Sequence, residues 1–291
     1  MNIKSARRTK SESAVARGKY RYIRMIKLLF FFVCAINYVQ AQDTTGMATV
    51  RPFNENDLKT FPVLWQQTAA EYRALCYQAF NVAELRVNEI PEQDFKNKKL
   101  AIVTDLDETI LDNSFIAAYK IVNGKDINYK AWKKWIDQPV VPTVPGAVQF
   151  LQYAASKGIT IFYISNRDVK GMNATLYLLA KLKLPDADTS HILLLTDNYS
   201  KEERRKYVSK DYDVIMLLGD NLNDFTQIFE DKPIDKRLSE TDKARDDWGK
   251  KFIVLPNSTY GDWESALYNY QSDLSPAQED AIRLQLLKNA K

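Results

Sequence analysis

The stretch LAIVTDLDET, residues 100–109, joins an unbroken apolar run to a pair of aspartates. Residues 100–104 have the length and composition of a strand that is buried on both faces. Asp105 and Asp107 follow where that strand would end, and α/β folds bind their ligands at the carboxyl ends of parallel strands. This stretch therefore predicts both the fold class and the place of the chemistry.

Further apolar runs of four to six residues repeat the pattern at residues 159–164, 192–195, 214–218 and 252–255. Nearly continuous apolar runs of this length are typical of strands in a parallel sheet. Polar or helical segments separate them along the chain. Strands that alternate with helices predict an α/β fold with a doubly wound parallel sheet.

Helical periodicity marks residues 62–90, 146–157, 171–183 and 276–288. The first of these segments keeps the 3.6-residue period over its whole length, which predicts one long amphipathic helix between Pro62 and Pro91. Cys76 lies on the apolar stripe of that helix, so we expect its thiol to pack in the core.

The first 41 residues predict a secretory signal peptide. Basic residues precede an apolar run at 28–36, and Ala41 ends a short segment with the small residues that signal peptidase reads. The run is too short to span a bilayer, so we expect a periplasmic or secreted protein and no membrane span. Met25 is an alternative start, which would leave residues 1–24 untranslated. A lipid-anchored form through Cys34 is disfavoured, because bulky residues precede this cysteine.

Composition narrows the chemistry further. The chain of 291 residues has a formal charge of +4, but its first 41 residues hold nine basic residues and one acidic residue. The remainder has 32 basic and 36 acidic residues, which argues against a nucleic acid polymer as partner. One histidine and two cysteines exclude histidine-rich and cysteine-based zinc sites. The groups that remain as candidates for the chemistry are carboxylates, hydroxyls, lysine and a hard metal ion.

Polar residues follow four of the predicted strands: Asp105 and Asp107, then Ser165, Asn166 and Arg167, then Lys201, and finally Asp220 and Asp224. Aspartates gathered at neighbouring strand ends would repel one another without a cation, and all-oxygen ligands favour a hard ion, Mg²⁺ first. The Lys201 ammonium and the Ser165 hydroxyl can surround an anion with three exposed oxygens. That arrangement meets the electrostatic demand of phosphoryl transfer.

The structural alternative is that these carboxylates cap helices and hold a structural ion. For Asp112 this interpretation is preferred, because Asp112 and Asn113 precede a helical segment and are good capping residues. For Asp224 it stays open, since an acidic side chain early in a helix is favourable in any case.

Five blocks in order carry a family resemblance: IVTDLDETILDNS (102–114), FYISNRD (162–168), YSKEERR (199–205), LLGDNLNDF (217–225) and LPNSTYGDWE (255–264). The series resembles the haloacid dehalogenase (HAD) superfamily and, within it, the class C nonspecific acid phosphatases, which are lipoprotein e-type 5′-nucleotidases. The resemblance runs from about residue 65 to the end. It implies a HAD-like, Rossmannoid fold with a small helical cap.

The resemblance also implies roles for the acidic residues. Asp105 would attack phosphorus and form an aspartyl-phosphate. Asp107 would protonate the leaving oxygen and later accept a proton from water, which leads us to expect an acidic pH optimum. Mg²⁺ would be held by Asp105, the backbone carbonyl of Asp107 and Asp220. Asp224 would support the ion through water or through a contact to one of its direct ligands.

Other residues of these blocks would bind the substrate. Ser165 would donate to a phosphoryl oxygen, and Lys201 would offset the charge of the nucleophile and the phosphate. Asn166 and Arg167 would either contact the substrate or orient their loop. In the resembled family, a tryptophan and a tyrosine sandwich a nucleobase over the site.

The positions of that aromatic pair in this chain are Trp132 and Tyr260. Core packing is the expected role of Trp135 and Trp263.

We expect four parts in the chain: the signal peptide at 1–41, a helical segment at 42–97, a phosphatase core at 98–260 and a helical segment at 261–291 that packs on the core. A small cap insertion would occupy about 113–145.

The predicted function is Mg²⁺-dependent hydrolysis of phosphomonoesters, nucleoside 5′-monophosphates foremost. The alternatives are a phosphotransferase on the same fold and a non-catalytic envelope protein that binds haem or nucleotide. A homodimer is expected from the resemblance.

Overall fold

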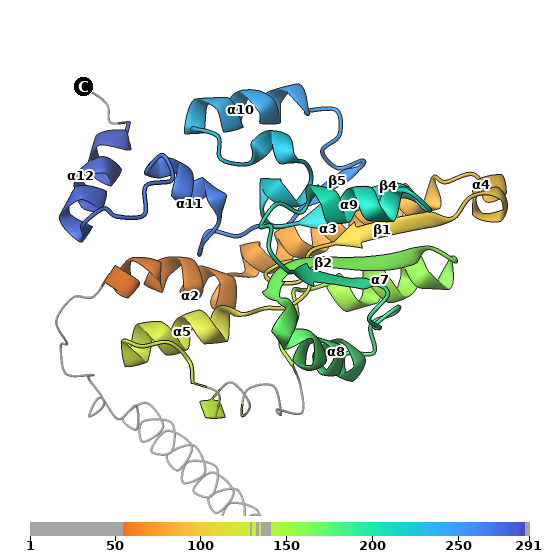
Figure 1. Cartoon of the computed structure of the whole chain (residues 1–291), viewed down its shortest axis with the longest axis horizontal. Helices are drawn as coiled ribbons and strands as arrows, with labels where there is room; N and C mark the ends of the chain where they lie inside the picture. Colours follow the sequence, from red (N-terminus) through yellow and green to blue (C-terminus); the bar gives the residue numbers. More distant parts are fainter. Residues whose placement is uncertain (1–54, 129, 132–133, 135–140, 289–291) are drawn as a thin grey trace, which may run out of the picture. The chain divides into compact units, whose positions relative to one another are not determined.

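The computed structural model describes residues 55–128, 130–131, 134 and 141–288. Its centre is a five-stranded sheet in the order β3-β2-β1-β4-β5, and every pairing is parallel (Figure 1). The strands are β1 (Leu100–Thr104), β2 (Thr160–Asp168), β3 (Ile192–Leu195), β4 (Asp213–Gly219) and β5 (Phe252–Val254). All five predicted strands are present, and the predicted α/β fold with a parallel sheet is confirmed.

Helices connect and flank the strands. Among the described elements after the first strand, the α-helices with given bounds are α5 (Ser114–Asn123), α7 (Ala147–Ser156), α8 (Met172–Lys181), α9 (Glu202–Ser209), α10 (Ile234–Lys243), α11 (Asp262–Leu267) and α12 (Pro276–Leu286). Shorter 3₁₀ turns are η2 (Glu55–Lys59), η3 (Val169–Gly171), η4 (Leu222–Asp224) and η5 (Gln227–Phe229), and α4 (Glu92–Asn97) precedes β1. The helices predicted near 146–157, 171–183 and 276–288 are therefore confirmed.

The segment predicted as one helix over 62–90 is two helices, α2 (Thr60–Thr68) and α3 (Ala70–Asn88). Ala69 between them is extended, with φ −76° and ψ 125°. The Thr68 hydroxyl donates to the Leu64 carbonyl at 2.7 Å, a bond that competes with the helical ladder. The break lets α2 pack on α5 while α3 packs on α7 and β5. The single-helix prediction is wrong because the hydrophobic period is alike on both sides of the break.

Alternate side chains of β1 enter two different cores. Ile102 lies in the larger core, which α3, α7 and α8 cover and which includes Cys76 as expected. Ala101 and Val103 point to the opposite face, where α9 contributes Val208 to a smaller core. A strand that is buried on both faces needs apolar residues at every position, which is why its sequence shows no alternation.

The register of the sheet brings the predicted site residues to one edge. Thr104 of β1 lies opposite Tyr163 of β2 and Leu218 of β4. Asp105 therefore leaves the sheet beside the ends of both neighbouring strands, from which Ser165 and Asp220 project. Because parallel strands end at the same edge, Asp105 meets residues that lie 60 and 115 positions further along the sequence.

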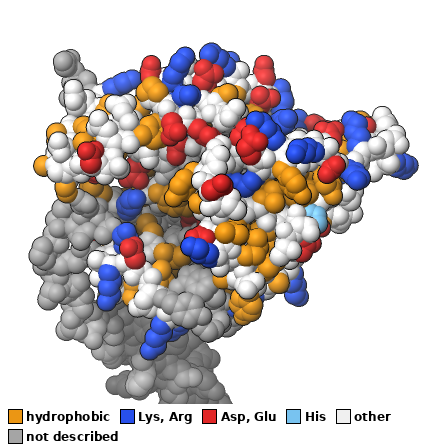
Figure 2. Space-filling model, in the orientation of Figure 1, with side chains coloured by type: hydrophobic (Ala, Val, Ile, Leu, Met, Phe, Trp, Pro, Cys, Tyr) orange, Lys and Arg blue, Asp and Glu red, His pale blue; other side chains and the backbone are white. Residues whose placement is uncertain are grey.

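The expected signal peptide and residues 42–54 lie outside the described residues. Among the residues that are described, no helix is both long and apolar enough to cross a membrane. On the face presented in Figure 2, basic and acidic side chains are interspersed over the described surface.

Candidate active site

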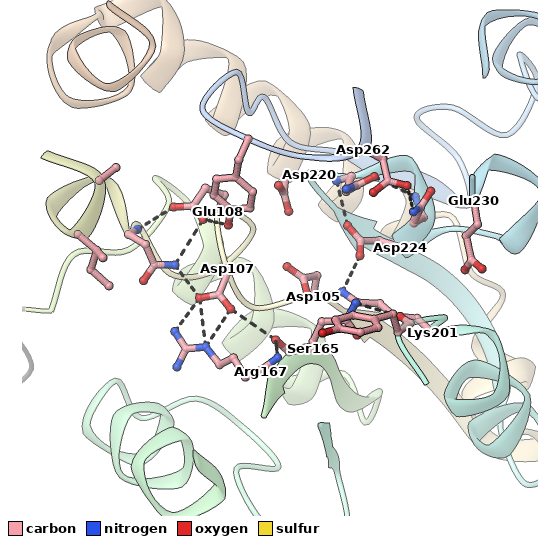
Figure 3. Close-up of a pocket in the computed structure, with 18 of the residues that line it drawn as sticks. Asp105, Asp107, Glu108, Ser165, Arg167, Lys201, Asp220, Asp224, Glu230 and Asp262 are labelled. Carbon is pink, nitrogen blue, oxygen red and sulfur yellow. Dashed lines mark hydrogen bonds and ion pairs between the residues drawn. The ribbon is translucent and has the colours of Figure 1, made fainter. Parts of the chain in front are cut away.

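A cavity of about 800 Å³ opens at the carboxyl ends of β1, β2 and β4 (Figure 3). Its walls come from the loops after these strands, from α5 and from the loop before α11. The cavity brings together every predicted site residue that the structure describes: Asp105, Asp107, Ser165, Asn166, Arg167, Lys201, Asp220, Asp224 and Tyr260.

Asp105 sits at the buried centre of the cavity. Its backbone N–H donates to the Leu218 carbonyl at 2.9 Å, so the edge of the sheet holds it in place. Its carboxylate is in contact with the Lys201 ammonium, which also donates to Asp224 Oδ1 at 2.6 Å. Burial raises the pKa of Asp105, and the Lys201 charge only partly offsets this effect. Burial would lower the pKa of Lys201, but its two carboxylate partners outweigh burial and raise it.

Asp105, Asp220 and Asp224 form an acidic cluster in which each offers a carboxylate oxygen within 4.8 Å of the other two. Asp220 accepts hydrogen bonds from two uncharged donors, the Thr109 hydroxyl at 3.1 Å and the Asn257 amide at 2.8 Å. Burial raises the pKa of Asp220 well above its ordinary value, and the neighbouring carboxylates raise it further. When ionised, the three carboxylates beside Lys201 carry two negative charges in excess of the lysine charge, and oxygen donors suit hard ions. This donor set fits the expected divalent cation.

Because Gly219 has no side chain, the Asp224 carboxylate can occupy the space beside it. A Cβ atom at Gly219 would lie 2.7 Å from Asp224 Cγ and closer still to two other atoms of that side chain. Asp224 Oδ2 in turn accepts the Asn221 backbone N–H at 2.9 Å, which closes a capping box around η4. The glycine at the end of β4 is thus needed for the acidic cluster.

We expect Gly219→Ala to weaken Mg²⁺ binding by about 10- to 100-fold, because the added methyl group displaces Asp224 from the cluster. Calorimetric titration of the chelator-treated protein with Mg²⁺ measures this effect. Gly171→Ala is the matched control, since a Cβ at Gly171 meets nothing within 4 Å and its φ of −85° suits alanine. Equal affinities for the Gly219 variant and the control would contradict the prediction.

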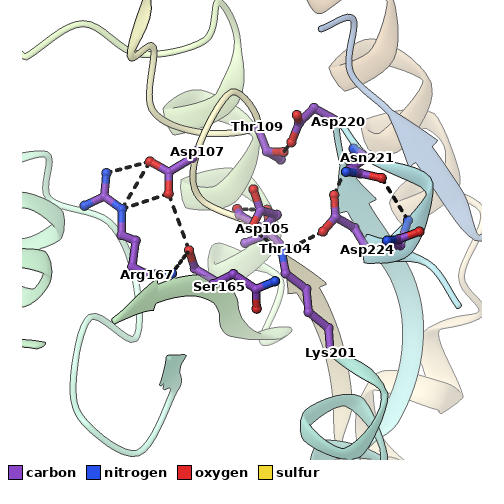
Figure 4. Close-up of polar contacts among 12 residues, drawn as sticks. Thr104, Asp105, Asp107, Thr109, Ser165, Arg167, Lys201, Asp220, Asn221 and Asp224 are labelled. Atoms are coloured by element: carbon purple, nitrogen blue, oxygen red, sulfur yellow. Dashed lines mark hydrogen bonds and ion pairs between the residues drawn. The ribbon is translucent and has the colours of Figure 1, made fainter. Parts of the chain in front are cut away.

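Asp107 points away from the acidic cluster and faces Arg167 (Figure 4). Arg167 Nη2 donates to Asp107 Oδ1 at 2.6 Å, and Arg167 Nε donates to both carboxylate oxygens at 3.1 and 2.9 Å. Burial alone would raise the pKa of Asp107, but the Arg167 charge and hydrogen bonds outweigh burial and lower it. Arg167 therefore binds the predicted general acid directly, a partner that the sequence did not reveal.

Asn113 also binds this acid instead of capping α5. Its amide donates to Asp107 Oδ1 at 2.6 Å, and no side-chain hydrogen bond from Asn113 caps the helix. The expected capping role of Asn113 is therefore wrong, because the nearby carboxylate accepts its amide. Asp112 does cap locally, since its Oδ1 accepts the Ser114 N–H at 2.9 Å and the Gln66 amide at 2.9 Å.

Glu108 is a site residue that sequence reasoning missed. It is buried at φ 58°, and its carboxylate accepts the Tyr260 hydroxyl and the Asn113 N–H. Burial raises the pKa of Glu108 to about 7, although the hydrogen bond from Tyr260 lowers it. The contact fixes the Tyr260 hydroxyl on the loop that carries Asp107. Glu108 and Tyr260 are 152 positions apart in the sequence, so no local pattern could have indicated this hydrogen bond.

Ser165 is buried at the end of the apolar part of β2, with its hydroxyl 3.5 Å from Asp107 Oδ2. Asn166 next to it lines the cavity, but its side chain bridges two loops. Its amide donates to the Tyr199 carbonyl at 2.9 Å, and its oxygen accepts Arg204 Nη2 at 2.5 Å. These contacts fit the second of the two roles expected for Asn166, in which it orients its loop.

Of the aromatic residues expected at the site or in the core, the structure describes Tyr260 and Trp263. Trp132 and Trp135 lie outside the described residues. Tyr260 lines the cavity, where it is 42% exposed. Trp263 is 44% exposed, so its expected place in the core is wrong. Its indole N–H donates to the Tyr260 carbonyl at 3.2 Å, which supports the tyrosine-bearing loop from the surface.

Comparisons with known proteins indicate the family of the chain. The family model described as HAD superfamily, subfamily IIIB (acid phosphatase) matches residues 32–263. Two solved structures of the class C acid phosphatase from Bacillus anthracis, one of them a crystal structure with tungstate bound, are similar at 41% sequence identity and a TM-score of 0.74. Each match covers 81% of this chain and 99% of the other chain.

Proposed function

We propose that this chain, which belongs to subfamily IIIB of the HAD superfamily and is a phosphoric monoester hydrolase of the class C acid phosphatase type, works through Mg²⁺ and the Asp105 carboxylate. The observation that carries this proposal is the acidic cluster of Asp105, Asp220 and Asp224 beside the single Lys201 charge. The excess negative charge of the cluster favours binding of a divalent cation. A bound cation in turn favours binding of a phosphate dianion.

In the proposed reaction, Asp105 attacks phosphorus while the bond from phosphorus to the ester oxygen breaks. Asp107 gives its proton to that leaving oxygen. Water then attacks the aspartyl-phosphate, Asp107 takes its proton, and inorganic phosphate leaves Asp105 free again. Ser165 and Lys201 hold the phosphoryl oxygens during both steps. A bound divalent cation would supply Lewis-acid neutralisation of the phosphate charge.

Metal removal tests this proposal. We expect turnover of p-nitrophenyl phosphate to fall about 100-fold or more after dialysis against EDTA and to return with Mg²⁺, because the acidic cluster then lacks its neutralising charge. The same EDTA saturated with Mg²⁺ beforehand is the control and should leave turnover intact. Undiminished hydrolysis by the metal-free protein would exclude the proposed mechanism.

For the substrate we propose nucleoside 5′-monophosphates. The support is Tyr260 at the cavity and the family resemblance that pairs this position with Trp132. Base stacking contributes about 1–3 kcal/mol, so Trp132→Ala should raise KM for AMP about 5- to 150-fold and leave glycerol phosphate unaffected. Tyr177→Ala, which removes an exposed ring from α8, is the matched control. Unchanged kinetics on AMP in the Trp132 variant would remove the stacking proposal.

Export and a homodimer complete the proposal. The basic and apolar segments before Ala41 support cleavage there and a periplasmic or secreted location. Mass spectrometry of the exported chain, which reads its mature N-terminus, and light scattering of the purified protein test these two points.

A further inference from the structure

Two consecutive arginines on the first turn of α9 reach the backbone of two different active-site loops. They follow Lys201, which precedes the helix and pairs with Asp105 and Asp224. Neither arginine is used in the proposed reaction. Arg204 directs its guanidinium group at a backbone carbonyl in the irregular last part of β2, between Ile164 and Asp168. Arg205 directs its guanidinium group at backbone carbonyls of η4, after the end of β4.

Arg204 holds the loop that carries Ser165. Its Nη1 donates to the Ser165 carbonyl at 2.7 Å, and its Nη2 donates to Asn166 Oδ1 at 2.5 Å. The same Nη2 lies 3.3 Å from the Ser200 carbonyl and 3.4 Å from the Tyr199 carbonyl. One guanidinium thus joins the last part of β2 to the loop before Lys201. With both of its terminal nitrogens bound to the protein, Arg204 acts on the phosphate site through Ser165.

Arg205 holds the loop that carries Asp224. It is buried, and its Nη1 donates to the Asn223 carbonyl at 2.8 Å and to the Asp224 carbonyl at 3.0 Å. Its Nη2 donates to Glu202 Oε2 at 2.7 Å, which fixes the guanidinium plane on the helix. These bonds hold the backbone of the residue whose side chain completes the acidic cluster. Arg205 has no hydrogen bond to Ser165 or Asn166 among the described contacts.

We infer that Arg204 and Arg205 are positioning residues with separate duties: Arg204 sets the phosphate-binding loop and Arg205 sets the metal-binding loop. The inference rests on the proposed function and adds two residues to it. Arginine suits both positions because its planar fork donates in several fixed directions at once. A lysine at either position keeps the charge but has no planar fork to donate to all of these partners at once, so the conservative exchange separates geometry from electrostatics.

The test compares Arg204→Lys and Arg205→Lys in the full chain. Calorimetry of the chelator-treated protein gives the dissociation constant of Mg²⁺, and inhibition by inorganic phosphate at saturating Mg²⁺ gives the phosphate affinity. We expect Arg205→Lys to weaken Mg²⁺ about 10- to 100-fold and Arg204→Lys to weaken phosphate by a similar factor. Each variant should keep the other constant within about twofold. Lys206→Gln, an exposed residue on the same helix, is the control and should change neither.

The outcomes divide clearly. Parallel losses of both affinities in both variants, no loss in either, or the reverse assignment would overturn the inference. If Arg205→Lys fails to fold, Glu202→Gln replaces it, because loss of the bond to Arg205 Nη2 should weaken Mg²⁺ in the same direction and leave phosphate unchanged. A wild-type chain that binds no Mg²⁺ would instead overturn the proposed function, before the variants are compared.

Discussion

Asp105→Asn should lower kcat for p-nitrophenyl phosphate by at least about 10⁴-fold, the scale of loss when a covalent nucleophile is removed. The amide keeps the shape of the side chain but cannot form the aspartyl-phosphate. Acid-quenched wild-type protein should carry the mass of one phosphoryl group on the peptide that contains Asp105, and the variant should not.

The control for this variant is Asp197→Asn, which removes an exposed carboxylate beyond the end of β3. We expect the control to keep full turnover, and circular dichroism should show that both variants are folded. An Asp105→Asn protein with wild-type turnover would require a different nucleophile.

Asp107→Asn should lower kcat/KM about 10²- to 10⁴-fold, the usual contribution of a general acid and base. The loss should be larger for an alkyl phosphate than for p-nitrophenyl phosphate, because nitrophenolate leaves without a proton. This difference between leaving groups distinguishes lost proton transfer from general damage. Equal losses on both substrates would contradict the assignment of Asp107.

The pH dependence follows from the partner of Asp107. Burial would raise the pKa of this group, but Arg167 outweighs burial and lowers it, so the protonated form is populated only in acid. We therefore expect wild-type kcat/KM for the alkyl phosphate to fall as pH rises above that lowered pKa. Asp107→Asn has no such group and should show a flatter profile between acidic and neutral pH.

The sequence predicted the sheet and the edge at which the site lies. Runs such as 100–103 are apolar at every position, and this pattern is found where strands are buried on both faces. Once the strands are parallel, their carboxyl ends must share one edge. Asp105, Ser165 and Asp220 therefore meet by topology alone, and the structure places them around one cavity.

The side-chain partners inside that cavity could not be predicted in the same way. The sequence predicts that Asn113 caps a helix, but its amide binds Asp107. The sequence gives no indication of Glu108, whose carboxylate binds the Tyr260 hydroxyl. Such contacts depend on the exact course of loops that are brought together from distant parts of the chain. A hydrogen bond forms only within a few tenths of an ångström of its preferred length, and residue spacing does not specify loops to that accuracy.

The sequence by itself thus determined the fold and the family and predicted which polar residues meet at the cavity, because apolar runs, motif blocks and strand-end positions are local properties. Only the tertiary structure decided where the long helix breaks at Ala69, which side chain holds Asp107, and why Gly219 must lack a Cβ atom. Each of these features depends on packing between segments that are far apart in the sequence and share no sequence pattern. The physical reason is that close packing and hydrogen bonding act across space, whereas periodicity acts along the chain.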